Sequence, residues 1–273
     1  MKKKFIDYIV DSFKILFQNK ILLFPGVVDT LYGGFLLLIS YNLVINVHRG
    51  GMFSTLLLLL LTGMGAAFLI AGKLNMIRLV YEKEHGGEED GEIESPQVSD
   101  YFEGAKDFGL KIFGGSLLIM VGALIFFIPL LMISVMMQVF ILVMIVTIGF
   151  VVLMLFITLW DTILVADDTP ITDAIGDSIS FVKGNFLVVL GLNLFAGIIS
   201  FEDVLSPNID VGAQNYGQGP LFELPIVYQW FANTLGPLSW PVILVVAMVF
   251  NVIAHMVFMD LYLDRRNRYG SFS

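Results

Sequence analysis

Six long apolar runs, separated by short polar segments, organise this chain. A helix that crosses the hydrocarbon core of a bilayer needs about 20 predominantly apolar residues. The pattern therefore predicts an all-α polytopic membrane protein with six transmembrane helices. Their predicted spans are 21–47, 52–80, 110–136, 139–165, 186–201 and 238–263.

The third and fourth runs are fused, because no charged residue occurs from Ile112 to Trp160. One continuous helix over this stretch would be about 74 Å long, more than twice the thickness of the hydrocarbon core. A hairpin is therefore expected, and the interval from Pro129 to Gln138 is the best place for it. Ser134 and Gln138 supply the only polar side chains there.

Lys and Arg are distributed unevenly about the predicted spans. Six spans put both termini on one side, and with that side in the cytoplasm only Arg49 of the 15 Lys and Arg residues lies outside. The 14 predicted cytoplasmic residues are Lys2, Lys3, Lys4, Lys14, Lys20, Lys73, Arg78, Lys83, Lys106, Lys111, Lys183, Arg265, Arg266 and Arg268. Because cytoplasmic loops carry an excess of Lys and Arg, this predicts a protein of the cytoplasmic (inner) membrane with both termini inside.

Two longer loops carry much of the acid behind the net charge of −9. The acidic loop 82–103 is predicted to be a solvated cytoplasmic connector, with docking of a basic partner as the alternative. The extracytoplasmic loop 202–237 contains no Lys or Arg, and its aromatic part predicts a half-embedded helix over 225–235. The chain has no cysteine, which excludes disulfide and thiolate chemistry.

An internal repeat is the next informative feature. DYIVDSFKILFQN at 7–19 matches DAIGDSISFVKGN at 173–185, and a weaker copy, DYFEGAKDFGLKI, starts at Asp100. The identical positions of the first two copies are Asp7, Asp11, Ser12 and Asn19 against Asp173, Asp177, Ser178 and Asn185. We interpret the chain as one integral membrane domain, 1–273, of three pseudo-repeat units at about 1–82, 98–168 and 169–273. Each unit is predicted to begin with a cytoplasmic interfacial amphipathic helix, at 4–18, 98–109 and 170–183.

The stretch DTPITDAIGDSISFVKGNFLVVLGLNLF at 168–195 and the segment MDLYLDRR at 259–266 carry a family resemblance. They resemble a loose group of uncharacterised prokaryotic membrane proteins. That group is related to the membrane domain of glycerophosphodiester phosphodiesterases and to the YciC-like inner-membrane proteins. The resemblance implies a six-helix membrane fold and carries over no catalytic residue.

Small residues favour close packing of the second predicted span. Gly63, Gly65 and Gly72 occur there, with alanines at 66, 67 and 71. Small residues let helix backbones approach closely in membranes. The same interpretation applies to Gly114 and Gly115 in the third span.

A few polar side chains fall within the predicted spans and define the candidate site. Ionisable residues inside a membrane are functional candidates because their burial is costly. The candidate intramembrane polar cluster is Asp29, Asp161, Asn193, Asn251 and His255, and Lys73 and Asn75 end the second span. Asn251 and His255 share a helix face, since they are four residues apart. The alternatives are structural hydrogen bonding between helices, a substrate or proton site, and catalysis.

No catalytic, metal-binding or nucleotide-binding motif is present in the sequence. Three histidines on different predicted levels do not make a metal site, and no cofactor is expected. The leading hypothesis is a non-enzymatic membrane protein with a scaffold, accessory or lipid-organising role. The alternative is a small transporter or permease with a polar site in the inner half of the membrane. Expected partners are membrane lipids and a protein or second copy of the chain, not nucleic acid.

Overall fold

The computed structural model describes residues 3–46, 52–85, 96–137, 140–199 and 239–266. Within these ranges every regular element is a helix, which confirms the predicted all-α class for this part of the chain. The elements are α1 (Phe5–Gln18), η1 (Lys20–Leu22), α2 (Leu23–Asn46), α3 (Met52–His85), α4 (Val98–Met136), α5 (Phe140–Phe156), α6 (Trp160–Asp167), α7 (Ile171–Ile199) and α10 (Ser239–Arg266). The acidic segment 86–95 and the segment 200–238, with the predicted helix at 225–235, lie outside the described residues.

Five helical segments among the described residues are long and apolar enough to cross a membrane. They are Leu56–Glu84, Val98–Met136, Phe140–Asp167, Ile171–Ile198 and Val242–Arg266. These segments support a multi-pass helical membrane protein. The first predicted span coincides with α2, which has 24 residues but is not among the five segments.

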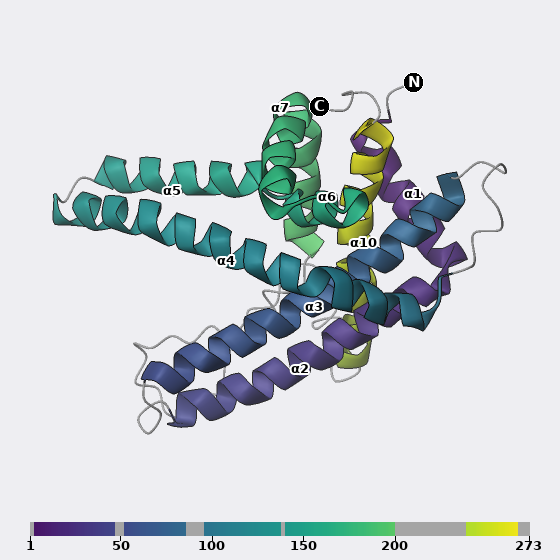
Figure 1. The fold of residues 1–273 in the computed structure, drawn as a ribbon, viewed down its shortest axis with the longest axis horizontal. Coiled ribbons are helices and arrows are strands. Elements are labelled where there is room, and N and C mark those ends of the chain that lie inside the picture. The colour runs from purple at the N-terminus through teal and green to yellow at the C-terminus, as the bar shows by residue number, and fades with distance from the viewer. Residues whose placement is uncertain (1–2, 47–51, 86–95, 138–139, 200–238, 267–273) are drawn as a thin grey trace.

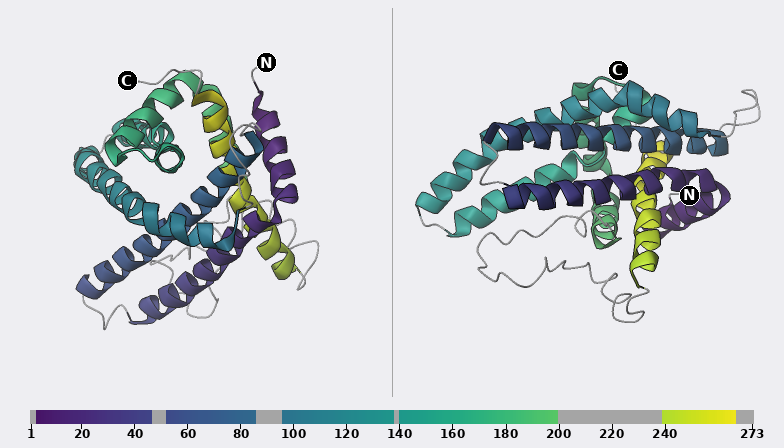
Figure 2. Two further views of the ribbon diagram at one scale, coloured as in Figure 1. Left: turned by 45° about the vertical axis from the view of Figure 1, so that its right-hand side comes forward. Right: turned by 90° about the horizontal axis from the view of Figure 1, so that it is seen from below.

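Two helix pairs extend from a common core (Figure 1). Helix α2 lies beside α3, and α4 lies beside α5, and the far ends of both pairs point away from the region where α1, α6, α7 and α10 gather. Figure 2 shows α10 and α7 running across the direction of α2 and α3. Most buried side chains belong to α1, the second half of α3, the first part of α4, α6, α7 and α10. The far ends of the α4–α5 pair expose apolar side chains such as Ile125, Met136 and Phe140.

Glycines allow α3 and α4 to pack at close range. A Cβ atom on Gly72 would lie 2.6 Å from the backbone oxygen of Tyr101, and one on Gly109 would lie 2.8 Å from the ring of Phe68. A Cβ on Gly104 would overlap the side chain of Asn75. The small residues predicted to allow close packing of the second span thus lie on the side of α3 that packs against α4.

The residues that match between repeat copies take similar local roles. Each copy has an aspartate as the third residue of its helix, and Asp7 and Asp100 accept the backbone N–H of Lys4 (2.6 Å) and Gln97 (2.7 Å). In the third copy Pro170 stands three residues before Asp173, where the other copies have Lys4 and Gln97, and proline has no N–H to donate. The hydrogen bonds to Asp7 and Asp100 thus cap the first turns of α1 and α4.

Two asparagines lie at matching positions of the first and third sequence copies, Asn19 and Asn185. Asn19 ends α1, and its Nδ2 donates to the backbone oxygen of Ile15 (3.1 Å). Asn185 has non-helical dihedral angles inside α7, and its Nδ2 donates to Phe181, again four residues back (3.0 Å). The segment 170–183 and the fifth predicted span are therefore two parts of α7, separated by a kink at Asn185.

The middle copy differs, because residues 98–109 form no helix of their own and continue directly through α4. Ile112 stands where the other copies have asparagine, so this side chain cannot hydrogen-bond the preceding turn. Gly104 replaces the second aspartate, and its contact with Asn75 leaves no room for a side chain. The close packing of α4 on α3 accounts for the departure.

The uncharged stretch from Ile112 to Trp160 folds back as expected, at a slightly different place. Helix α4 passes through Pro129 and ends at Met136, so that the connection to α5 lies at the end of the predicted interval. The fourth predicted span is interrupted between α5 and α6 at residues 157–159. Helix α6 ends at Asp167 and is capped by Asp168, whose φ of 48° is left-handed.

Candidate functional site

Lys73 lies at the centre of the polar cluster. Its side chain is 2% exposed, and its Nζ donates to Asp29 Oδ2 and to Asn251 Oδ1, both at 2.6 Å. The three residues belong to α3, α2 and α10, so one ammonium group ties three helices together. Asp29 is 16% exposed, and the pair is an ion pair between largely buried groups.

Small residues next to the cluster bring its helices together. A Cβ atom on Gly26, one turn before Asp29, would lie 2.6 Å from Met248 Cγ and 2.8 Å from the Met248 backbone oxygen. Helix α2 can therefore approach α10 closely enough for Asp29 and Asn251 to share the same ammonium group. Gly72 brings α4 against α3 beside Lys73 in the same way.

His255 and Asp161 lie within the electrostatic influence of Lys73. His255 is one turn after Asn251, and its Nδ1 is 3.0 Å from the Asn251 backbone oxygen. This contact is a hydrogen bond in the tautomer that carries its proton on Nδ1. Asp161 is half-buried on α6, and its Oδ1 accepts the backbone N–H of Thr162 (2.7 Å). Among the described residues, Lys73 Nζ hydrogen-bonds to Asp29 and Asn251 and to neither of these two side chains.

Asn193 takes part in a separate contact. Its Oδ1 accepts a hydrogen bond from Thr158 Oγ1 (3.0 Å), and its Nδ2 donates to the backbone oxygen of Val189 (2.9 Å). It thus joins α7 to the break between α5 and α6. Of the five predicted cluster residues, Asp29 and Asn251 meet at Lys73, His255 and Asp161 flank that pair, and Asn193 lies apart.

Lys73 is the central residue of the cluster in the structure, but it is not one of the five residues that the sequence predicts for it. Its position near the end of an apolar run places it with the predicted cytoplasmic cations, so the predicted cluster does not include it. The sequence does contain a pattern that indicates Lys73. An aspartate inside a predicted span needs a counter-charge, and Lys73 is the basic residue nearest the middle of the next predicted span.

Buried apolar side chains lie next to Lys73 and Asn251 along α3 and α10. The neighbours in sequence, Ala71, Leu74 and Val252, are fully buried. Two cavities in the described part of the chain lie elsewhere. One, of about 710 Å³, runs along α4 and α5, and the other, of about 150 Å³, lies near Lys3 and Glu84. Neither is lined by a residue of the cluster.

One buried hydroxyl stands next to the cluster without a partner among the described residues. Tyr101 is 2% exposed, its hydroxyl has no hydrogen-bond partner, and the charge of Asp29 acts on it. No group of three or more potential metal ligands occurs in the part of the chain that is described. Lys73 and its partners supply ion pairing and hydrogen bonding at the cluster.

Searches of protein-family models, of curated proteins and of solved structures find no match for this chain.

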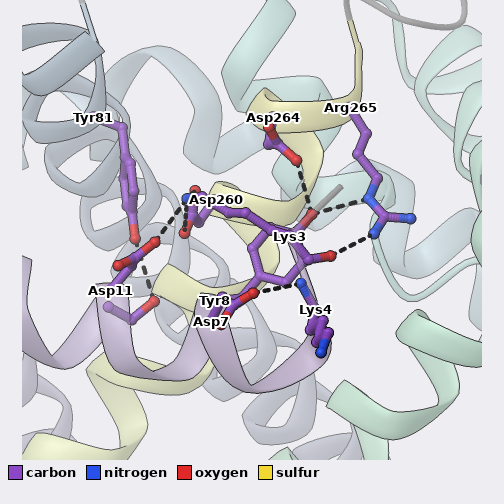
Figure 3. A network of polar contacts seen from close by, with 10 residues as sticks. Lys3, Lys4, Asp7, Tyr8, Asp11, Tyr81, Asp260, Asp264 and Arg265 are labelled. Atoms are coloured by element: carbon purple, nitrogen blue, oxygen red, sulfur yellow. Dashed lines mark hydrogen bonds and ion pairs between the residues drawn. The ribbon is translucent and has the colours of Figure 1, made fainter. Parts of the chain in front are cut away.

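A second polar network joins the two ends of the chain (Figure 3). Arg265 is 8% exposed and donates from Nε to Tyr8 Oη (2.9 Å), from Nη1 to Asn185 Oδ1 (2.5 Å) and from Nη2 to the Lys3 backbone oxygen (3.3 Å). The Tyr8 hydroxyl donates to Asp264 Oδ2 (2.8 Å). One guanidinium thus holds α1, the kink of α7 and the end of α10 together.

Burial and neighbouring charges shift the pKa values of Tyr8 and Lys3 at the start of the chain. Burial, opposed by Arg265 and aided by Asp264, raises the pKa of Tyr8 to about 12, so its hydroxyl stays protonated at neutral pH. Burial lowers the pKa of Lys3, but hydrogen bonds and charges from Asp11 and Asp260 outweigh it and raise the pKa above the ordinary value. Lys3 therefore stays charged while it bridges α1 and α10.

Proposed function

We propose that this chain is a non-enzymatic integral protein of the cytoplasmic membrane with a scaffold, accessory or lipid-organising role. The observation that carries the proposal is the burial of the Lys73 ammonium group between two partners on other helices. Its side chain is 2% exposed, and its Nζ donates to Asp29 and Asn251. Such a group ties helices together, whereas a transport site needs a path for its substrate.

The proposal includes six spans in three units, with both termini in the cytoplasm. Support comes from the five long apolar segments, from the helical form of α2 and from the matched positions of Asn19 and Asn185. The contacts of Lys3 with Asp260 and of Arg265 with Lys3 hold the two described ends of the chain close together (Figure 1), which supports a shared side of the membrane for both. The expected partners are membrane lipids and a protein or second copy of the chain. Kinship with the YciC-like group belongs to the same proposal.

A small transporter or permease is the second candidate. The observation in its favour is the presence of two more titratable groups, His255 and Asp161, within the influence of Lys73. A proton or a polar substrate could use such groups if water reached them. The two candidates therefore differ in whether the cluster is accessible from either side of the membrane.

Accessibility can be measured with one cysteine, because the chain has none of its own. We expect Asn251→Cys, in the full chain in vesicles, to stay unreactive toward a small, charged thiol reagent applied on both sides. The matched control is Lys4→Cys, at an exposed position outside the spans, which should react completely. Reaction of the Asn251→Cys protein at a rate near that of the control would favour the transporter and contradict the scaffold.

The orientation has its own test. Cysteines at Gly87 and Gln214 replace residues of the acidic loop and of the predicted outer loop. A membrane-impermeant thiol reagent added to intact cells is expected to label the cysteine at 214 and to reach the one at 87 only after lysis. Labelling of the cysteine at 87 in intact cells, or none at 214, would show that the proposed orientation is wrong.

A further inference from the structure

We propose that the groove between α4 and α5 binds one acyl chain of a bilayer phospholipid. The cavity has a volume of about 710 Å³ and is lined by α4, α5 and the start of α6. Six of its lining residues are Ser116, Ala123, Phe127, Thr147, Phe150 and Trp160. This volume is within the range of roughly 300–1,000 Å³ that is usual for small-molecule sites.

Water is a poor occupant of this groove. A buried water molecule needs two to four polar partners, and the lining offers only three hydroxyl groups. The hydroxyl of Thr147 already donates to the Val143 backbone oxygen (2.9 Å), and that of Thr158 donates to Asn193 (3.0 Å). An unfilled space of this size would leave many apolar side chains without van der Waals contacts. The lining therefore requires an apolar occupant.

The position of the groove identifies that occupant. Its lining lies within the uncharged stretch from Ile112 to Trp160, so that it lies at the depth of the hydrocarbon core. At this depth the abundant apolar material is the acyl chains of the bilayer. This step rests on the proposed membrane embedding of the chain.

Contacts at its base and along its length hold the groove open. A Cβ atom on Gly115 would overlap the ring of Trp160, so this glycine lets α4 lie directly against the start of α6. Farther along, the rings of Phe127 and Phe150 meet edge to face with centroids 5.1 Å apart and join α4 to α5. Between them Ala123 presents a side chain too small to fill the space.

Fluorescence of Trp160 can report the bound chain. Trp160 is 9% exposed and lines the groove, and the other tryptophans, Trp230 and Trp240, can be replaced by phenylalanine. The full chain is then placed in vesicles of phosphatidylcholine that carries bromine atoms on one acyl chain. We expect Trp160 to lose fluorescence relative to unbrominated vesicles. Filling the groove with Ala123→Phe should remove this loss, whereas Gly122→Phe, which points into open space, should leave it unchanged.

A third variant separates this inference from the proposed embedding. Gly122→Trp, combined with replacement of Trp160, Trp230 and Trp240 by phenylalanine, puts the only tryptophan on the exposed face of α4. Quenching in this protein but not at Trp160 would overturn the acyl-chain site and leave the embedding intact. No quenching in either protein would contradict the embedding itself. Trp160 quenching that persists in Ala123→Phe, or a dimer cross-linked through the groove in vesicles, would also overturn the site.

Discussion

Lys73→Met is expected to lower the free energy of unfolding by about 3–5 kcal/mol, as is typical when one partner of a buried ion pair is removed. Methionine has a similar shape but leaves the carboxylate of Asp29 without a counter-charge and the Asn251 oxygen without its donor. The measurement is denaturant-induced unfolding of the purified full chain in mild detergent, followed by circular dichroism.

The matched control for this variant is Lys111→Met. Lys111 also forms an ion pair, with Asp168 at 2.5 Å, but both side chains are exposed, at 44% and 64%. Exposed pairs contribute about 0–1 kcal/mol, so the control should lose little stability. Equal losses in the two variants would show that Lys73 is no more important than a surface lysine.

Arg265→Met should have the second large effect. The change removes three hydrogen-bond donors from a buried position, so that Asn185 Oδ1, the Lys3 carbonyl and Tyr8 Oη each lose the donor that Arg265 supplied. We expect a loss of about 2–4 kcal/mol, because buried acceptors that lose a charged donor pay most of their desolvation penalty. Unfolding in denaturant measures the loss, and limited proteolysis should detect release of α1 at the same time.

Arg266 provides the comparison for Arg265 on the same turn of α10. Its guanidinium pairs with Asp167 at 2.6 Å, and its side chain is 35% exposed. Arg266→Met is expected to change the unfolding free energy by no more than about 1 kcal/mol. If Arg266→Met released α1 as readily as Arg265→Met, the role assigned to Arg265 would be wrong.

The helical fold of the described residues was predictable because hydrophobic runs are long and charges are sparse. A close helix contact on the small face of α3 was also predictable from Gly72 and its small neighbours, but the sequence did not identify α4 as the partner. The boundaries were harder to predict. Helix α4 continues through residues 98–109 without a break, because Ile112 offers no side-chain hydrogen bond to the preceding turn, whereas α7 is kinked at Asn185, which makes one.

The candidate site was only partly predictable from the sequence. Asp29 and Asn251 could be selected because each is polar within an apolar run, and a shared level in the membrane suggested that they meet. Sequence position does not reveal which way a side chain points around its helix, and so Asn193 could not be separated from the others. The Arg265 network was missed because arginine at the end of a predicted span is expected at the membrane surface.

The most direct test of the structural role assigned to the cluster is the double variant Asp29→Asn, Lys73→Met. It removes both charges and keeps a hydrogen-bonding amide beside Asn251. The unfolding free energies of the two single variants, the double variant and the original protein form a double-mutant cycle. If the Asp29–Lys73 ion pair joins α2 to α3, the double variant should recover most of the stability that Lys73→Met loses. Losses that simply add would contradict a direct interaction between Asp29 and Lys73.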